Sequence, residues 1–370
     1  MMKIPIIDLV RQHEPIIDEL VEAFKKVVES GQFILGPELE QFEKEAAEYL
    51  GSKYALGVGN GTDALTLALR AVGISEGDEV ITTPFTFFAT AETIAMLGAR
   101  PVFVDVEEST LNIDVTKIEE KITRCTKAIL PVHIFGQGAK MEQILDIAKR
   151  HDLKVIEDTA QGFGAKRNGK YLGTFGDVGT FSFFPTKNLS CLGDGGLVTT
   201  QDETIYETVR KLRVHGSPRK YYHEMLGYNS RLDAIQAAFL RVKMKYIDRW
   251  NERRIQIAAI YNKELSPYVR VPEIDDGNVH IYHQYTIRTE KRDELNAFLN
   301  QRGIMTQVHY PIPLHLQPAL SYLGYKEGDF PVAERATKEV LSLPVFPEMT
   351  DEEIYYVIDS IKDFFRGKKA

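Results

Sequence analysis

Between residues 54 and 158, short apolar segments alternate with helical patterns, and this alternation constrains the fold more than any other feature. The predicted strands are 54–58, 79–83, 101–106, 128–133 and 154–158. The predicted helices between them are 62–72, 89–97, a segment across Ile118, and 141–151. Short apolar strands that alternate with helices indicate a mainly parallel sheet covered on both faces. We therefore predict an α/β fold.

Helical patterns precede and follow this region. Two amphipathic helices are predicted at 14–30 and 37–50, each closed by a glycine. Residues 231–265 contain neither Gly nor Pro and predict one long helix that bridges two lobes. The segments after it predict a smaller α+β domain, with a strand at 279–289 and helices at 291–301, 331–341 and 350–365. We predict a large domain at 1–250, which includes the N-terminal helices, and a small C-terminal domain at 251–370.

Length and charge narrow the class of protein. A chain of 370 residues exceeds one ordinary core, which agrees with two domains. The net charge of −8 disfavours nucleic acid or an anionic membrane as the main partner. With two cysteines, a disulfide framework is not expected, and a cytoplasmic location fits. Asp8 and Arg11 interrupt any signal-peptide pattern, and no segment approaches the roughly 20 apolar residues of a membrane span. We expect no metal site.

Lys187 is a lone lysine between two β-prone segments, in the stretch FSFFPTKNLSCLGDGGLVTT (181–200). Desolvation lowers the pKa of a lysine, and a neutral amine is a nucleophile that forms imines with aldehydes and ketones. The glycines after it, at 193, 195 and 196, would let the chain turn tightly behind the lysine. The alternative is an ordinary surface lysine.

A turn between a strand and a helix favours a phosphate. It has the sequence Gly59-Asn60-Gly61-Thr62, where free N–H groups and the helix dipole attract an anion and Thr62 adds a hydroxyl. The turn matches neither the Walker pattern nor GxGxxG, so nucleoside triphosphates and dinucleotides lose support. Ser182, five residues before Lys187, could donate to the same phosphate. The alternative is a tight turn in which Thr62 only caps the helix.

Asp158 ends a buried strand, where a carboxylate needs a partner. A pyridinium nitrogen is such a partner, because the carboxylate keeps the ring protonated and makes it an electron sink. The alternative is an aspartate that caps the next segment. After another strand, one ring of the aromatic strip 85–88 could stack on a planar cofactor, while at least two of its three rings are expected in the core.

Phosphate turn, aromatic strip, acid and lysine together favour pyridoxal phosphate. The chain also resembles the DegT-type nucleotide-sugar aminotransferases, which are pyridoxal-phosphate enzymes of the aspartate aminotransferase fold. The resemblance covers essentially the whole length and includes IPIIDLVRQ, GQFILGPELEQFE, NGTDAL, GDEVIT, EDTAQ, FSFFPTKNLSCLGDGG, YNSRLDAIQAA and HYPIPLHLQPA. It implies the type I fold of these transferases, with a mainly parallel seven-stranded sheet in the large domain and a small α+β C-terminal domain.

The resemblance implies roles for the residues around the cofactor ring. Lys187 would form the Schiff base with pyridoxal 5′-phosphate and later move the proton between cofactor and substrate carbons. Asp158 would pair with the pyridine nitrogen, and Gln161 would contact the ring hydroxyl. Phe87 would stack on the ring, where many relatives carry Tyr or Trp with a polar tip.

Further residues would hold the phosphate and the substrates. The backbone of Gly61 and the hydroxyls of Thr62 and Ser182 would bind the cofactor phosphate. Asn229 would reach the phosphate of the neighbouring subunit, which implies a homodimer with shared active sites.

Three more residues would bind the substrates by resemblance. Arg231 would face the carboxylate of the amino donor, with L-glutamate as the expected donor. His309 and Tyr310 would line the sugar-nucleotide pocket. The alternatives are that Arg231 forms a structural ion pair at the helix start and that the HYP loop is a packed turn. The candidates for contacts to the sugar diphosphate are Arg213, His215, Arg219, Lys220 and His309.

The substrate inference rests on local resemblance. Relatives with His in place of the lysine perform deoxygenation, so Lys187 favours amine transfer. The segments 187–196 and 219–231 look most like enzymes that aminate carbon 3 of nucleotide-linked keto sugars, which serve deoxyamino-sugar and polysaccharide biosynthesis. We expect a dTDP-linked 3-keto-6-deoxyhexose first and a UDP-linked 3-keto uronic acid second. Enzymes that act on carbon 4 share the core motifs and stay as an alternative.

Two other functions stay open from the sequence. One is a regulatory or sensor protein that keeps the fold without turnover, against which the intact Lys187 and Asp158 argue. The other is a pyridoxal-phosphate enzyme of another reaction class, such as an aldolase or decarboxylase. The YNSRLD and HYPIPLH segments favour sugar transamination over this second alternative.

Overall fold

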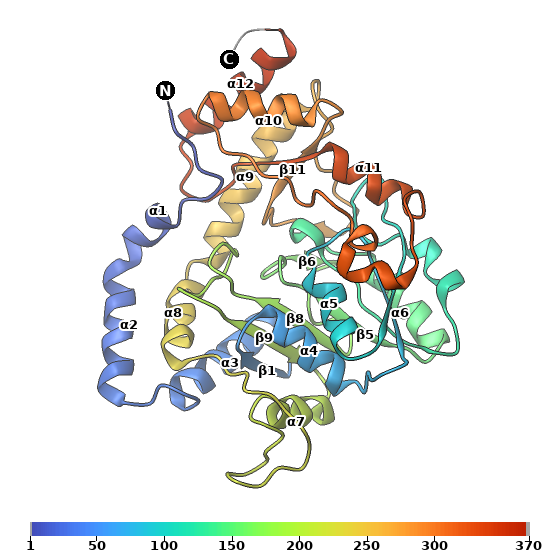
Figure 1. The fold of residues 1–370 in the computed structure, drawn as a ribbon. Helices are drawn as coiled ribbons and strands as arrows, with labels where there is room; N and C mark the ends of the chain where they lie inside the picture. Colours follow the sequence, from blue (N-terminus) through green and yellow to red (C-terminus); the bar gives the residue numbers. More distant parts are fainter. Residues whose placement is uncertain (1, 368–370) are drawn as a thin grey trace.

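The computed structural model describes residues 2–367 and contains a central seven-stranded sheet with helices packed around it (Figure 1). The strand order is β1-β9-β8-β5-β4-β2-β3. The strands are Tyr54–Val58 (β1), Glu79–Thr82 (β2), Arg100–Phe103 (β3), Thr126–Ile129 (β4), Lys154–Asp158 (β5), Val178–Ser182 (β8) and Gly196–Thr200 (β9). Only β9 runs antiparallel to its neighbours, β1 and β8. The predicted α/β fold with a mainly parallel sheet is confirmed.

Capping residues mark several of the helix ends. Their bounds are Leu9–His13 (α1), Ile17–Ser30 (α2), Pro37–Leu50 (α3), Gly61–Ala71 (α4), Ala89–Met96 (α5), Met141–Arg150 (α6), Glu203–Leu212 (α7), Ala234–Met244 (α8), Ile247–Leu265 (α9), Arg292–Gln301 (α10), Pro331–Glu339 (α11) and Asp351–Phe365 (α12). Gly31 and Gly51 close α2 and α3 with φ of 66° and 69°, in the left-handed region that glycine adopts without strain. Thr350 and Glu353 form a reciprocal capping box at the start of α12.

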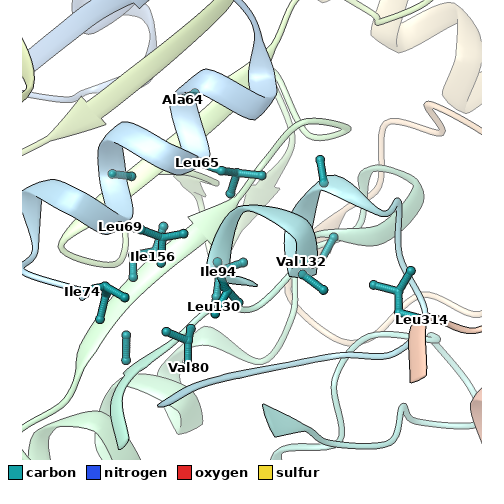
Figure 2. Close-up of a cluster of buried hydrophobic side chains, with 14 of the residues drawn as sticks. Ala64, Leu65, Leu69, Ile74, Val80, Ile94, Leu130, Val132, Ile156 and Leu314 are labelled. Atoms are coloured by element: carbon teal, nitrogen blue, oxygen red, sulfur yellow. The ribbon is translucent and has the colours of Figure 1, made fainter. Parts of the chain in front are cut away.

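The main core lies between the sheet and the helices that cover it. Figure 2 shows Leu65 and Leu69 of α4 beside Ile156 of β5 and Leu130, all fully or almost fully buried. Leu314, from the C-terminal part of the chain, belongs to the same cluster, and its N–H donates to the Pro84 carbonyl at 2.7 Å. The segment around Leu314 is therefore anchored on the large sheet, and the division of the chain at residue 250 stays a prediction.

A second core lies at the top of Figure 1, where the first and last described segments meet. It contains the two-stranded sheet of Tyr285–Arg288 (β11) and Val340–Leu343 (β12), with α10 and α12 beside it. Ile4 is fully buried there and pairs with Ile304 in an isolated bridge. A third small sheet joins Lys166–Arg167 (β6), Lys170–Tyr171 (β7) and Asn278–Val279 (β10).

The predicted long helix at 231–265 is wrong in its start and in its continuity. Asp233 pairs with Ile34 in an isolated bridge, and the N–H of Ala234 donates to the Phe33 carbonyl, so the helix cannot start before residue 234. It is then interrupted at Lys245 and Tyr246, where α8 ends and α9 begins two residues further on. The contacts with residues 33 and 34 account for the later start, and no Gly or Pro marks either position.

Three shorter predictions also differ from the structure. The segment across Ile118 forms two short 3₁₀ helices, Val115–Lys117 and Glu119–Lys121, in place of one helix. The strand predicted at 279–289 is divided between β10 and β11. The helix predicted at 331–341 ends at Glu339, because the β-prone residues that follow pair with β11 as β12. Among the helices of residues 2–367, none has the length and apolar character needed to cross a membrane.

Asp105 fixes α11 to the loop after β3, and its replacement tests this anchoring. Its buried carboxylate accepts hydrogen bonds from the N–H groups of Val332 and Ala333, at 3.1 and 2.9 Å. We expect Asp105→Ala to lower the free energy of unfolding by about 1–3 kcal/mol, because buried donors at a helix start lose their acceptor. Urea unfolding measures this change. The control Asp359→Ala, at an exposed position of α12, should leave the free energy of unfolding unchanged, and equal effects of both substitutions would contradict the anchoring.

Candidate active site

The predicted site residues gather at the carboxyl ends of neighbouring strands. Asp158 is the last residue of β5, and Ser182 is the last residue of β8. Lys187 follows Ser182 in an irregular turn, and Gly61 begins α4 directly after β1. Since β5 and β8 are adjacent and parallel, their ends open onto one edge of the sheet, where ligands bind in folds of this kind.

Lys187 carries an amine with no hydrogen-bond or ion-pair partner among residues 2–367. Its backbone N–H donates to the Phe184 carbonyl at 2.8 Å, which closes a tight turn. Burial lowers the pKa of Lys187 to about 8, and the charge of Asp158 opposes this shift. A substantial fraction of the amine is therefore a neutral nucleophile near pH 7–8.

Asp158 is buried, and each of its carboxylate oxygens already accepts one hydrogen bond. The hydroxyl of Thr90 donates to Oδ2 at 2.8 Å, and the N–H of Ala160 donates to Oδ1 at 3.1 Å. Burial raises the pKa of Asp158, whereas these two donors and the charge of Lys187 counteract the rise. The carboxylate is thus fixed in orientation and keeps acceptor capacity for a further, positively charged donor.

Gln161 joins two segments that are 149 residues apart in sequence. Its Oε1 accepts the N–H of Phe135 at 2.5 Å, so its Nε2 points the other way and donates to the Tyr310 hydroxyl oxygen at 3.0 Å. Because the hydroxyl oxygen accepts this bond, the hydroxyl hydrogen of Tyr310 is free to be donated elsewhere. Burial raises the pKa of Tyr310, and the charge of Asp158 adds to this shift. The Tyr310 hydroxyl therefore lies close enough to Asp158 to be affected by its charge.

The aromatic strip divides as its sequence predicts. Phe85 is fully buried, and Phe88 packs against the main core. Phe87 is 59% exposed, and its ring centre lies 6.4 Å from that of Tyr310. Of the three rings, Phe87 is the one that a planar ligand could cover, because its face is not occupied by the core.

The phosphate turn and the end of β8 are in direct contact. A Cβ atom on Gly61 would lie 2.7 Å from the Cβ of Ser182, so only glycine allows this approach. The Ser182 oxygen accepts the N–H of Phe184 at 3.3 Å, which leaves its hydroxyl hydrogen free. The hydroxyl of Thr62 has no partner among the described residues. Two hydroxyl donors and the first N–H groups of α4 therefore meet at one point, an arrangement suited to a phosphate.

The glycines after Lys187 act through close packing and not through a left-handed turn. None of the three has a positive φ. At Gly196, a Cβ would lie 2.3 Å from the Asn60 carbonyl oxygen. The chain does reverse between the antiparallel strands β8 and β9, without a left-handed glycine, and Gly196 lets β9 approach the phosphate turn.

Asn229 and Arg231 lie just before α8, on either side of Ser230. Asn229 is exposed and Arg231 is half-buried, and neither side chain has a hydrogen-bond partner among the described residues. Ser230, between them, is held in place. Its buried oxygen accepts the N–H of Gly59 at 3.0 Å, which fixes the segment behind the phosphate turn. The roles expected for Asn229 and Arg231 stay predictions.

Among the candidates for diphosphate contacts, Arg213 is already occupied. It is buried, bonds the carboxylate of Glu43, and donates to the Gly57 carbonyl at 2.9 Å. Arg219 and Lys220 lie in the exposed loop that extends below α7 in Figure 1. His309 is half-buried, with its Nδ1 2.9 Å from the Ser342 hydroxyl. Burial lowers the pKa of His309 to about 4, and the charge of Lys187 adds to this effect.

Sequence reasoning missed three residues. Thr90 supports Asp158, and its signal was a threonine in an otherwise apolar helix start, next to the aromatic strip. Ser230 supports the phosphate turn but stands among other polar residues, so no pattern marks it. Lys243 on α8 is a second buried lysine whose pKa burial lowers to about 8, although its amine donates to the Ser190 carbonyl at 2.8 Å. Among the described residues, no carboxylate acts on the pKa of Lys243 as Asp158 acts on that of Lys187.

These observations fit pyridoxal phosphate. The nucleophilic amine suits the aldehyde of that cofactor, and the buried carboxylate suits its pyridine nitrogen. The amide beside a tyrosine hydroxyl suits the ring hydroxyl, and the glycine-lined turn suits the phosphate. Lys187 and Asp158 are not joined by an ion pair in the described part of the chain, so they do not cancel each other. The arrangement can attach an aldehyde, hold a protonated pyridine ring and transfer a proton.

Comparison with known proteins gives matches along almost the whole chain. Residues 15–362 match the model of the DegT/DnrJ/EryC1/StrS aminotransferase family. The chain is similar to a pleiotropic regulatory protein of Geobacillus stearothermophilus, with 53% identity over 99% of both chains. It is also similar to the dTDP-3-amino-3,4,6-trideoxy-α-D-glucose transaminase of Streptomyces venezuelae, with 43% identity over 98% of this chain and 96% of the relative.

The solved structures agree with the sequence matches. The crystal structure of S. venezuelae DesV in complex with a ketimine intermediate superposes with a TM-score of 0.97, at 42% identity over 99% of both chains. Another solved structure with this fold holds the pyridoxamine form of the cofactor. Given these matches and the fit of the site, the chain belongs to the DegT/DnrJ/EryC1/StrS family of aminotransferases, whose cofactor is pyridoxal 5′-phosphate.

Proposed function

We propose that this aminotransferase transfers an amino group from L-glutamate to carbon 3 of a nucleotide-linked keto sugar, with a dTDP-linked 3-keto-6-deoxyhexose as the first candidate. The observation that carries the proposal is the unpaired amine of Lys187 beside the buried carboxylate of Asp158. The UDP-linked 3-keto uronic acids are the second candidate, and 4-keto sugars the third.

The residues of the site divide the chemistry between them. Pyridoxal phosphate, when bound, supplies an aldehyde for the amine and a ring that delocalises the electrons left by proton removal. Asp158 holds the proton on the pyridine nitrogen, while Thr90 and Ala160 keep its carboxylate in place. Nζ of Lys187 accepts the proton from the donor carbon and returns it to the neighbouring carbon. Its low pKa favours both directions near neutral pH.

The other residues bind and orient. Gly61, Thr62 and Ser182 would hold the phosphate, and Phe87 would stack on the ring. The amide of Gln161 donates toward the ring hydroxyl, because its oxygen is held by Phe135. In the proposed roles, His309 and Tyr310 line the sugar-nucleotide pocket, and Arg231 binds a carboxylate of the donor.

The comparisons support amination at carbon 3. Relatives with 42–44% identity are named as transaminases or aminotransferases of 3-amino and 3-keto sugars linked to dTDP or UDP. One more similar relative is named as a regulatory protein, which keeps a non-catalytic member as the second candidate function. The intact Lys187, Asp158 and phosphate turn favour catalysis over that alternative.

We also propose a cytoplasmic homodimer with shared active sites. Asn229 is exposed and has no partner for its amide among the described residues, although the neighbouring Ser230 is fixed behind the phosphate turn. An amide held at a fixed position and facing outward suits a contact to a second subunit. In this proposal Asn229 completes the phosphate site of the partner.

The low pKa of Lys187 predicts the pH dependence of cofactor attachment. Only the neutral amine attacks an aldehyde, so the attachment rate of apoprotein should be half-maximal near pH 8 and level off about one pH unit higher. With an ordinary lysine, the attachment rate would keep rising to about pH 10.4. Stopped-flow absorbance measures this rate, and the reaction of a free alkylamine at the same pH corrects for ionisation of the cofactor. Lys187→Ala should show no attachment; a rate that still climbs above pH 9.5 contradicts the shifted pKa.

The proposed reaction is tested in two halves. L-glutamate should convert the bound cofactor to its amino form, and a panel of 3-keto and 4-keto sugar nucleotides should then restore the starting spectrum. We expect the 3-keto dTDP sugars to react fastest, with the mass of the product reporting the exchange of oxygen for NH₂. Bound cofactor with no glutamate half-reaction would favour the regulatory alternative, and a fastest reaction with a 4-keto sugar would overturn the choice of carbon 3.

Shared active sites predict complementation between inactive variants. Mixed dimers of Lys187→Ala and Asn229→Ala subunits contain one site in which both residues are native, provided that Asn229 acts across the interface. Refolding the two variants together should then recover up to about a quarter of the wild-type activity, the statistical share for equal mixing. If Asn229 acted within its own subunit, the mixture would be no more active than the average of the two variants.

A further inference from the structure

Two buried threonines stand in line behind the carboxylate of Asp158. The hydroxyl oxygen of Thr86 lies 3.1 Å from that of Thr90, and the hydroxyl of Thr90 donates to Oδ2 of Asp158 at 2.8 Å. Both threonines are buried, so bulk water does not compete for these bonds. Thr86 lies in the loop between β2 and α5, Thr90 lies in the first turn of α5, and Asp158 ends β5. The two bonds therefore join three separate parts of the fold.

The direction of these hydrogen bonds follows from the chemistry of the groups. An ionised carboxylate only accepts hydrogen bonds, and a hydroxyl has a single hydrogen to donate. The hydrogen of the Thr90 hydroxyl is used on Asp158, so the oxygen of Thr90 accepts the hydrogen of Thr86. Hydrogen bonds in a chain polarise one another, and the bond from Thr86 therefore strengthens the bond that reaches the carboxylate.

The charge of Asp158 depends on Thr90 more than on its other partners. Within residues 2–367, its carboxylate accepts one side-chain hydrogen bond, from Thr90, and one backbone hydrogen bond, from Ala160. Burial raises the pKa of Asp158, and the hydrogen bond from Thr90 is the strongest influence against this rise. The bond from Ala160 and the charges of Lys187 and His133 follow it. Loss of the Thr90 donor would therefore favour the neutral acid, which does not balance the charge of a pyridinium.

A third threonine near the start of α5 makes a different kind of contact. The hydroxyl of Thr93 is also buried, but it donates to the Ala89 carbonyl at 2.9 Å within the same helix. A bond to the preceding turn is the ordinary contact of a threonine inside a helix. Thr90 instead donates to a carboxylate at the end of a strand, and Thr86 supports that bond. Thr93 is therefore a matched reference for the two threonines that serve Asp158.

We propose that Thr86 and Thr90 form a hydrogen-bond relay that keeps Asp158 ionised and aimed at the protonated pyridine nitrogen of the cofactor. This inference rests on the proposed function, in which Asp158 holds the ring proton, and deepens it. Thr90 is a positioning residue that contacts the carboxylate, and Thr86 acts through Thr90. Because Thr86 directly precedes Phe87, the relay also links the aromatic strip to Asp158.

Binding of two matched ring compounds to the cofactor-free full chain tests the relay. One is pyridoxal 5′-phosphate, and the other is its analogue with CH in place of the ring nitrogen, which has no ring proton to share with Asp158. By calorimetry, we expect the wild type to bind pyridoxal phosphate at least about tenfold more tightly, the value of a charged hydrogen bond. Thr90→Val should lower this preference about tenfold. Thr86→Val should lower it about two- to fourfold, because only the cooperative part is lost. The control Thr93→Val should keep the preference, because its hydroxyl bonds only within α5.

A double variant distinguishes a relay from two independent contacts. If Thr86 acts through Thr90, the preference of Thr86→Val/Thr90→Val equals that of Thr90→Val alone. Effects that multiply in the double variant would overturn the relay. Thr86→Ser and Thr90→Ser keep the hydroxyls and should keep the preference, and a serine variant as low as its valine counterpart also overturns the relay. Where a valine variant does not fold, the alanine variant at the same position takes its place with the same expected loss.

The remaining outcomes separate the relay from the proposed function. An unchanged preference in Thr86→Val overturns the relay alone. A wild type that binds both compounds equally overturns the relay together with the role proposed for Asp158. The expected order of preferences in a protein whose cofactor is not converted by glutamate would refute the proposed amine transfer and support the relay.

Discussion

The site depends on an amine and a carboxylate that are desolvated at the same edge of the sheet without neutralising each other. Burial shifts the pKa of Lys187 down and that of Asp158 up, and each charge opposes the shift of the other. Had they formed a direct ion pair, the amine would be protonated and unreactive. Because Thr90 and Ala160 hold the carboxylate, the space between the two groups stays available for a ring that can interact with both.

The fold maintains this separation through contacts between distant parts of the chain. The core in Figure 2 packs α4 against β5, so the phosphate turn and Asp158 keep a fixed relation. The close approach of Gly61 to Ser182 joins that turn to the strand leading to Lys187. Gln161 then connects this edge to Tyr310, whose segment is anchored on the large sheet through Leu314. The cofactor site is therefore assembled from four segments, none of which would be positioned by its own local sequence.

Much of this arrangement could be predicted from the sequence, because its signals are local. Alternating strands and helices predict the sheet, strand ends predict the location of Asp158, and the glycine-rich turn predicts a phosphate site. The start of α8 could not be predicted, since the contact of Asp233 with Ile34 comes from a segment 199 residues away. Asn229 and Arg231 were selected by resemblance alone, and contacts within one chain do not assign them a partner.

Burial lowers the pKa of two lysines, Lys187 and Lys243, to about 8. We expect only Lys187 to react with the aldehyde of the cofactor. Lys243 is 1% exposed and donates to the Ser190 carbonyl, whereas Lys187 is unpaired and close to Asp158. Borohydride reduction of the holoenzyme, followed by peptide mass spectrometry, identifies the lysine that is attached to the cofactor. We expect the pyridoxyl label on the peptide that contains Lys187 and on no other. A label on Lys243, or no label on a protein that has bound the cofactor, would contradict this expectation.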